Sequence, residues 1–341
     1  MRSLTTVSEL EGAVGKRPPI HHLKSIPDLD EHCVAILAAS PFAVVTALTA
    51  AGSFVTTAVG GPPGVCAAGG PTRLDLPALA PLDVPDGTPA GIVALVPGYG
   101  ETLRVNGRLR TGAAPHLEVE EAFLHCAKCV IRSHLWDEPA GPSSGSTGGS
   151  TPTDPDVAAF IARSPFVFLG SADAGGGADV SPKGDPAGFI RVLDESTVAI
   201  PNRPGNRRTD TFHNLLERPE VGVLAVVPGD DRVLELRGRA HVTDDAAICA
   251  DMEVAGKSPS AALVVAVDHV DLRTDPALAL SQLWDGARHI EPGMLPKGTT
   301  VWVDHVKRND DPGLAAKAAR TLMNEKLMEK GIDRDYRTNL Y

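Results

Sequence analysis

The sequence contains no apolar run that approaches the roughly 20 residues needed to cross a membrane. Its first residues, MRSLTTVSELEGAVGKRPP, also lack the continuous apolar stretch of a signal peptide. The five cysteines form no framework of regular spacings and are typical of a reducing compartment. These absences predict a cytoplasmic protein without a membrane partner.

Net positive charge is lacking as well. Lys and Arg number 32 against 43 Asp and Glu, so the net charge is −11. Because nucleic acids and anionic membranes require a concentrated basic face, we expect no nucleic-acid partner. Basic residues do cluster locally at 203–208, an arrangement that suits a small phosphate better than a polymer. The length of 341 residues predicts about two domains.

An internal repeat divides the chain. The segment GIVALVPGYGETLRVNGR at 91–108 corresponds to GVLAVVPGDDRVLELRGR at 222–239. Upstream, AASPFAVVTAL at 38–48 corresponds to ARSPFVFLGSA at 162–172. Each copy reads as a helix, a Ser-Pro-Phe turn, an apolar strand, a long middle segment and two strands around a Val-Pro-Gly turn. Short, closely spaced strands with few helices predict a mainly β fold, with two small antiparallel barrels in tandem and flanking helices.

The composition sets the expected domain boundaries. Residues 1–136 form the first barrel domain, and the Gly/Ser/Pro-rich segment 137–155 is expected to be a flexible linker. Residues 156–311 form the second barrel domain. Residues 312–341 form a C-terminal helix and tail, with Gly331 as the helix stop.

Two segments carry further local expectations. Residues 60–89 are dense in Gly and Pro and are expected to be mostly loop. A helix is expected from about Glu120 to Leu135, and it would place His125, Lys128 and Arg132 along one face. A solvated charged face is the alternative for these three residues. The neighbouring Trp136 and the strand before the helix favour an interface instead.

Cys126 and Cys129 form a Cys-x-x-Cys pair in the same segment. Tetrahedral zinc needs four ligands and no second pair is present, so we predict no metal site and interpret both cysteines as small buried helix residues.

The densest group of chemically active residues spans 179–210. Lys183 lies in a Ser-Pro-Lys-Gly turn, and the basic segment 203–208 precedes a helix that begins near Thr209. Fixed cations, free backbone N–H groups and the positive end of a helix are what a phosphate requires. A solvated basic loop explains the same residues, and spacing alone leaves both interpretations open.

The sequence SPKGDPAGFIRVLDESTVAIPNRPGN, followed by NLLERPEVGVLAVVPG and LRGRA, resembles the pyridoxamine-5′-phosphate-oxidase-like family of FMN-binding split β-barrel flavoproteins. In the first half, LRVNGR followed by FLHCAKCVIRSHLW is similar to the end of the same domain. The resemblance covers most of 156–285 and parts of 28–136. It implies an internally duplicated, pseudo-dimeric member with FMN as cofactor.

The resemblance implies roles for the matching residues. Those that would lie against the isoalloxazine ring are Val180, Ser181 and Pro182. Those that would hold the FMN phosphate and ribityl chain are Lys183, Asn206, Arg207 and Arg208. In such homodimers the second subunit closes the flavin site. Here the first half would do so, with Trp136 at the cofactor and with His125, Lys128 and Arg132 as catalytic residues that orient an anionic substrate or stabilise charge near the ring.

The two copies depart from the family pattern in opposite places. The first has Thr56-Thr57-Ala58-Val59 where the Ser-Pro-Lys turn is expected. The second has VDHVDLRTDPALALSQLW where the His-Cys-Ala-Lys segment is expected. Each copy keeps what the other has lost, which predicts one flavin site between the repeats of an intramolecular pseudo-dimer. Further homodimerisation stays open.

The function implied is an FMN-dependent oxidoreductase that acts on a small, anionic or specialised metabolite. Hydride transfer to or from a flavin needs no dedicated acid or base. The protein therefore has to bind the flavin, orient the substrate and tune the electronic properties of the ring. Oxidation and reduction are not distinguished. A deazaflavin- or haem-binding split barrel and a non-catalytic binder are the alternatives, while the intact basic loop argues against an empty scaffold.

Overall fold

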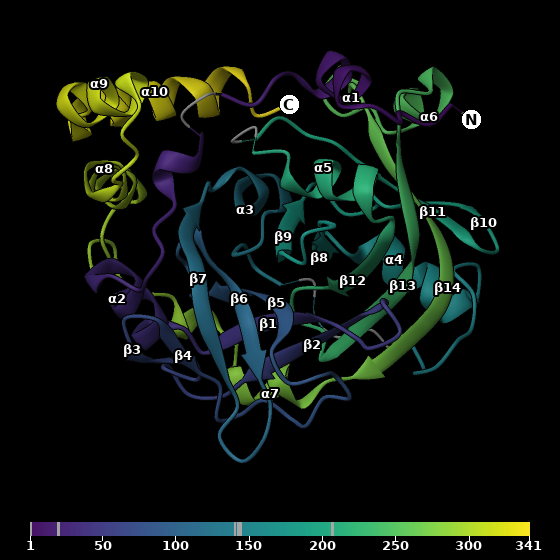
Figure 1. Ribbon diagram of the computed structural model, residues 1–341. Coiled ribbons are helices and arrows are strands. Elements are labelled where there is room, and N and C mark those ends of the chain that lie inside the picture. Colours follow the sequence, from purple (N-terminus) through teal and green to yellow (C-terminus); the bar gives the residue numbers. More distant parts are fainter. Residues whose placement is uncertain (1, 19–20, 140, 142–144, 206–207) are drawn as a thin grey trace.

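The computed structural model describes residues 2–18, 21–139, 141, 145–205 and 208–341. Two seven-stranded antiparallel sheets lie side by side, with helices around them (Figure 1). The expectation of a mainly β fold built from two tandem split barrels with flanking helices is confirmed.

The elements of the first half are α1 (Val7–Val14), η1 (His21–Lys24), α2 (Glu31–Ala39), β1 (Phe42–Leu48), β2 (Phe54–Gly60), β3 (Ala67–Gly70), β4 (Arg73–Asp75), β5 (Thr88–Leu95), β6 (Thr102–Arg110), β7 (His116–His125) and α3 (Lys128–Ser133). Those of the second half are α4 (Pro155–Arg163), β8 (Phe166–Ala172), β9 (Ala178–Gly184), β10 (Arg191–Asp194), β11 (Thr197–Pro201), α5 (Asp210–Glu217), β12 (Glu220–Val226), β13 (Arg232–Thr243), α6 (Ala246–Asp251), β14 (Ala262–Thr274), α7 (Pro276–Ser281) and η2 (Gly286–Arg288). The C-terminal helices are α8 (Gly298–Arg308), α9 (Leu314–Leu322) and α10 (Glu325–Thr338).

The two sheets share one topology. The first has the strand order β2-β1-β5-β6-β7-β4-β3, and the second, taken in the matching direction, has β9-β8-β12-β13-β14-β11-β10. The registers agree as well, since Phe42 pairs with Gly60 as Phe166 pairs with Gly184. The duplication seen in the sequence therefore extends to the three-dimensional structure.

The two halves pack against each other through an apolar layer that includes Phe42, Phe166 and Phe168. Glycine permits the close approach at equivalent places. A Cβ on Gly91 would lie 2.7 Å from the backbone nitrogen of Val180, and a Cβ on Gly222 would lie 2.6 Å from a side-chain oxygen of the first half. Real Cβ atoms do not sit this close to such atoms. The halves therefore form an intramolecular pseudo-dimer.

The chain termini cross between the halves. Leu4 and Leu10, near and within α1, belong to the core of the second half. Val301 and Trp302 of α8 belong to the core of the first half, where the Trp302 indole donates to the Leu124 carbonyl at 2.8 Å. Each barrel is thus covered partly by a segment from the far end of the chain (Figure 1).

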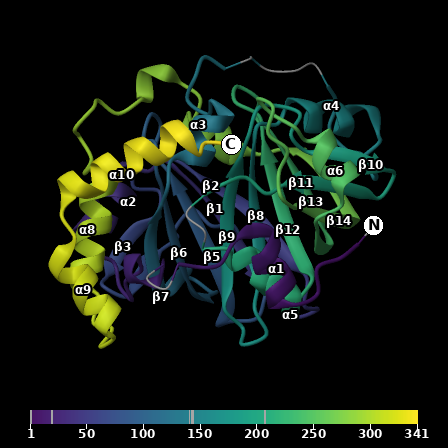
Figure 2. The same ribbon diagram turned by 90° about the horizontal axis from the view of Figure 1, so that it is seen from above.

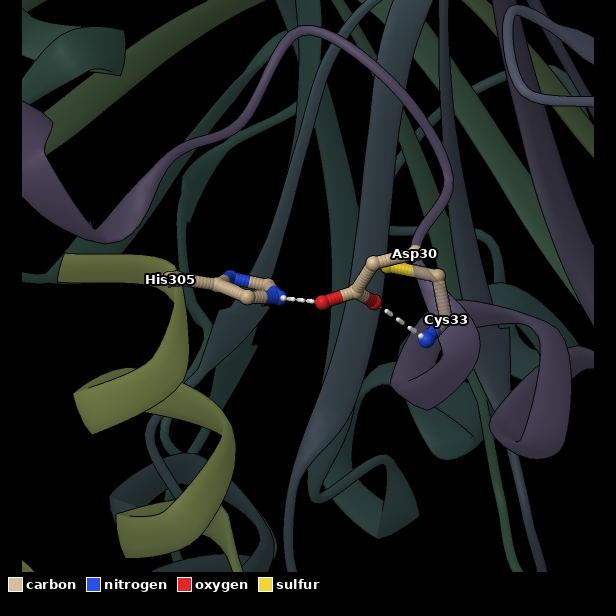
Figure 3. A group of neighbouring side chains, drawn as sticks. All are labelled: Asp30, Cys33 and His305. Carbon is tan, nitrogen blue, oxygen red and sulfur yellow. Dashed lines mark hydrogen bonds and ion pairs between the residues drawn. The ribbon is translucent and has the colours of Figure 1, made fainter. Parts of the chain in front are cut away.

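A buried ion pair holds α8 against the N-terminus of α2 (Figure 3). Asp30 caps α2 by accepting from the Cys33 N–H at 2.9 Å, and its other carboxylate oxygen lies 3.1 Å from Nε2 of the fully buried His305. Nδ1 of His305 lies 3.0 Å from the Lys24 carbonyl oxygen. Burial opposes ionisation, yet the hydrogen bonds from His305 and Cys33 hold the pKa of Asp30 below its usual range. Since both carboxylate oxygens have protein partners, we interpret this cluster as a structural anchor.

Substituting Asp30→Asn is expected to lower the free energy of unfolding by about 3 kcal/mol, because breaking a buried ion pair leaves a charge uncompensated. A depressed carboxyl pKa contributes stability above its unfolded value and loses it as the pH falls. The stability difference between wild type and variant should therefore persist down to the unfolded pKa of about 3.9 and shrink only below it, as the pH approaches the lower pKa of folded Asp30. Urea unfolding of both proteins from pH 7 down to about pH 2 measures this difference. Asp304→Asn, which alters a half-exposed pair with His32, is the control. Equal stability of wild type and Asp30→Asn would refute the anchor.

Residues 60–89 are mostly loop, as expected, but they also contain β3, β4 and the start of β5, and β4 pairs with β7. Two local expectations were wrong. The helix expected over 120–135 is β7 up to His125, followed by the short α3. Pairing of β7 with β6 along nearly its whole length outweighs the helix propensity of its Glu, Ala and Leu residues.

The second concerns the C-terminal helix, which does not stop at Gly331. Two helices form instead, and α10 continues through this residue to Thr338. Asn324 starts α10 by accepting from the Leu327 N–H at 2.9 Å. A glycine inside an exposed helix costs only about 1 kcal/mol.

The described part of the linker contacts the second half. The Gly148 N–H donates to the Leu272 carbonyl at 2.7 Å, and Arg232 donates to the Ser146 carbonyl at 3.0 Å. Among the described residues, no helix has the length and apolar character needed to cross a bilayer.

Candidate functional site

A cavity of about 510 Å³ opens between the two halves. The first half lines it with residues from β6, the end of β7 and α3. The second half lines it with segments 181–185, 201–205 and 208–212, and with the loop 257–260. Seven of the described lining residues are Lys or Arg and only two are Asp, in a chain whose net charge is −11. The cavity is therefore suited to an anionic ligand.

Most of the residues singled out from the sequence meet at this cavity. Those that line it are His125, Lys128, Arg132, Ser181, Pro182, Lys183 and Arg208. Val180 is buried in the apolar layer between the halves. Trp136 packs on Trp284 at a ring-centroid distance of 6.2 Å, and its indole donates to the Tyr99 carbonyl at 2.7 Å. Asn206 and Arg207 lie outside the described residues.

Lys183 is the cation best placed for an incoming anion. It lies near the end of β9 with Nζ 5.2 Å from the centre of the Phe212 ring. Within the described ranges its ammonium has no ion pair or hydrogen bond. Burial lowers its pKa to about 8, with Asp179 opposing and Arg104 adding to the shift. A half-buried ammonium that is only partly solvated is destabilised, so an anion in the cavity would stabilise it.

The neighbouring arginines are held by carboxylates. Arg208 lies 2.7 Å from Asp210 and 2.8 Å from Glu121 of β7, with its guanidinium 3.8 Å from the centre of the Phe123 ring. Arg203 lies 2.6 Å from Asp185. These contacts fix the orientation of both guanidinium groups at the cavity wall.

His125 ends β7 rather than lying on a helix. Its Nδ1 is 3.1 Å from the Cys126 carbonyl oxygen, so this nitrogen carries the proton of the neutral ring and Nε2 is an acceptor. Burial lowers the pKa of His125 to about 3, and Arg104 adds to the shift. At neutral pH His125 can therefore accept a hydrogen bond but cannot supply positive charge.

Lys128 and Arg132 lie one turn apart on α3 and contact the C-terminal segment. Lys128 Nζ lies 2.7 Å from an Asp335 carboxylate oxygen and 2.8 Å from the Asn339 carbonyl. Arg132 donates to the carbonyls of Gly184 at 3.0 Å, and of Pro204 and Leu340 at 2.9 Å. Arg132 thus joins α3 of the first half to two segments of the second half and to the tail.

Sequence reasoning missed a buried ion pair whose arginine lines the cavity. Arg104 of β6 lies 2.9 Å from one oxygen of Asp179 on β9, and Asn214 of α5 donates to the other at 3.0 Å. Burial raises the pKa of Asp179 to about 6, with Arg104 opposing the shift. One signal was available, because the repeat has Glu235 where the first copy has Arg104. Glu235 instead accepts from the Thr56 N–H at 3.2 Å.

The repeat relates the cavity to a second position, beside Gly60 and α7, and this position lacks the cations of the cavity. A Cβ on Gly184 would collide with the Cys129 carbonyl of α3, and one on Gly60 would collide with the Ala277 carbonyl of α7. The residue before each glycine is Lys183 in the second half and the buried Val59 in the first. On α7, Leu280 takes the place that Arg132 has on α3. The cavity lined by Leu280 measures only about 210 Å³.

Comparisons with known proteins found one family model and several solved structures that are similar to parts of the chain. Residues 153–274 match the family model described as pyridoxamine 5′-phosphate oxidase. The chain is similar to the solved HupZ protein of Group A Streptococcus (16% identity, TM-score 0.28, 33% of this chain and 86% of that chain). It is similar to a putative pyridoxamine 5′-phosphate oxidase of Lactobacillus delbrueckii (19% identity, TM-score 0.28, 36% and 98%). It is also similar to a general stress protein 26-related protein of Clostridium acetobutylicum (13% identity, TM-score 0.27, 34% and 84%). No curated protein matches the chain.

Fold, repeat and composite cavity define the class of the protein as an internally duplicated split β-barrel. Within it, residues 153–274 of the second half match the pyridoxamine 5′-phosphate oxidase family model. Members of this family are often flavin-binding oxidoreductases.

Proposed function

We propose that the chain is an FMN-dependent oxidoreductase with one flavin site in the cavity between its repeats. The observation that supports it best is Lys183, a half-buried cation without a counter-ion among the described residues, in a cavity of about 510 Å³ to which both halves contribute. The volume is in the range of cavities that enclose cofactors of this size. The excess of basic side chains suits a phosphate. A small anionic or specialised metabolite is the substrate class that such a cavity favours.

The residues of the cavity divide into binding and positioning groups. Lys183 would take the phosphate as a charge-assisted donor, and Arg208, held by Asp210 and Glu121, would present fixed N–H groups beside it. Ser181 and Pro182 would lie along the ring. His125 would accept a hydrogen bond from the flavin or the substrate through Nε2. Bound FMN supplies hydride chemistry, and the chain supplies binding, orientation and exclusion of water.

The purified protein, reconstituted with FMN, is expected to hold one flavin per chain. The reason is that the second position carries Val59 and Leu280 where the site has Lys183 and Arg132. Absorption near ~370 and ~450 nm, compared with the protein concentration, measures the ratio. A haem Soret band, or no retained FMN, would contradict the proposal. Two flavins per chain would contradict the single site.

FMN affinity is expected to fall as the pH rises above about 8. The pKa of Lys183 is lowered to about 8, so its ammonium loses the proton above this pH and with it the attraction to the phosphate. Binding that requires one proton weakens by about tenfold per pH unit well above that pKa. Fluorescence titrations from pH 6 to pH 10 measure the profile. Lys183→Arg should flatten it, and a flat wild-type profile would show that another group holds the phosphate.

A further inference from the structure

The helix α10 is held by polar contacts and by the partly buried Ile332, which packs against the core of the first half. No residue of Glu325–Thr338, all of which is described, is buried. Its first turns are tied to α8 by exposed contacts of Glu325 with Thr300 and of Glu329 with Lys297. Surface contacts of this kind contribute little to stability. Apart from the packing of Ile332, the position of the helix depends on what its far end contacts.

That far end reaches the cavity. Figure 2 shows α10 running toward α3, with the chain terminus close to α3. The Tyr336 hydroxyl accepts from the Ala127 N–H at 3.0 Å, at the start of α3. The carbonyls of Asn339 and Leu340 accept from Lys128 and Arg132, as described above. Two cations that the sequence suggested for catalysis thus bind the last residues of the chain.

Tyr341 is part of the cavity wall. Its ring centre lies 5.6 Å from the guanidinium of Arg203, and its main-chain oxygen accepts from Lys257 at 3.0 Å. Arg203 and Lys257 also line the cavity. Arg203 therefore holds the ring and Lys257 holds the main chain of Tyr341, at a place where the ring lines the open space.

We propose that residues 336–341 form a wall of the flavin cavity, and that Tyr341 restricts access to the bound flavin to molecules small enough to pass beside its ring. The inference rests on the proposed function. Lys128 and Arg132 are positioning residues in this arrangement, since they act on the site by holding the wall. The Tyr341 ring has no role in holding the phosphate, which is assigned to Lys183 and Arg208.

Two variants test the wall. Tyr341→Ala removes the ring but keeps the main-chain contacts, and a chain that ends at residue 335 removes the segment. Tyr341→Phe is the conservative control, and Leu322→Ala on the exposed face of α9 controls for a general effect of C-terminal changes. Each FMN-loaded protein is measured for quenching of flavin fluorescence by iodide and by acrylamide. Acrylamide is neutral, so it reports access to the flavin without attraction to positive charge. Iodide is an anion and would also respond to Lys128 and Arg132 once they lose their contacts with residues 339 and 340.

We expect both quenching constants to rise at least threefold in Tyr341→Ala and in the shortened chain, and to stay unchanged in the two controls. The FMN dissociation constant of Tyr341→Ala should remain within threefold of the wild type. After photoreduction, reoxidation by 9,10-phenanthrenequinone should accelerate more than reoxidation by the smaller p-benzoquinone. Each quinone takes two electrons and two protons from the reduced flavin.

The outcomes separate the two proposals. A wild type that binds no FMN would overturn both. FMN bound by all variants with unchanged quenching and an unchanged ratio of the two quinone rates would overturn the wall alone. Unfolding curves of Tyr341→Ala that match the wild type would show that any increase in access is local.

Discussion

Replacing Lys183 with Met is expected to weaken FMN binding by roughly 10- to 150-fold, since a hydrogen bond to a charged group contributes about 1.5–3 kcal/mol. Methionine keeps an apolar stem of similar length beside Phe212 and removes the ammonium. Within the described residues no carboxylate pairs with Lys183, so its removal leaves no unpaired acid behind. The loss should therefore appear in ligand binding and leave the stability of the empty protein nearly unchanged.

Fluorescence titration with FMN at pH 7 measures this effect, and urea unfolding without FMN measures the stability. Lys183→Arg should keep most of the affinity because the charge remains. Lys317→Met, on the exposed surface of α9, is a matched control in which the same substitution is made far from the cavity. If Lys183→Met bound FMN within twofold of the wild type, the phosphate would have to lie elsewhere, and the proposed orientation of the flavin would be wrong.

Much of the fold could be predicted from the repeat. The strand pairs around Val-Pro-Gly and the strands after Ser-Pro-Phe are local, strongly apolar segments, and both copies show the same pattern. The segment containing His125 was mispredicted, because its Glu, Ala and Leu residues favour a helix while its pairing with β6 is a tertiary effect. The strands β3 and β4 escaped prediction for a similar reason, since β4 is stabilised by pairing with β7 about 40 residues away in the chain.

The candidate site was predictable only where its residues lie close together in sequence. Lys183 and the basic segment after Arg203 form a continuous motif, and His125, Lys128 and Arg132 form another. The contacts of Lys128 and Arg132 with Asn339 and Leu340 join segments more than 200 residues apart, and no local pattern encodes them. Arg104 was overlooked because an arginine in a strand next to a turn resembles a surface residue. Its burial becomes evident only in the three-dimensional structure, where it pairs with Asp179.

Substituting Arg104→Met is expected to lower the free energy of unfolding by about 3–5 kcal/mol, the cost of leaving one member of a buried ion pair unpaired. Among the described residues, Asp179 would retain the hydrogen bond from Asn214 and the more distant charge of Arg208. Since the two charges lie in different halves, the variant should weaken the contact between the repeats. The double variant Arg104→Met/Asp179→Leu should recover most of the loss because no uncompensated charge remains. Arg108→Met, which alters a partly exposed pair with Glu120, should cost less than about 1 kcal/mol.

The pH dependence of this variant separates a charge effect from a packing effect. The folded pKa of Asp179 is raised to about 6, above its unfolded value, so the ionised form is disfavoured in the folded state and stability is lost as the pH rises through that range. Without Arg104 the pKa should rise further. The deficit of Arg104→Met in urea unfolding should therefore be largest at pH 8 and shrink toward pH 5, where Asp179 becomes protonated. A deficit independent of pH would mean that Arg104 stabilises the interface through its packing on Phe123, 4.7 Å away, instead of through the charge of Asp179.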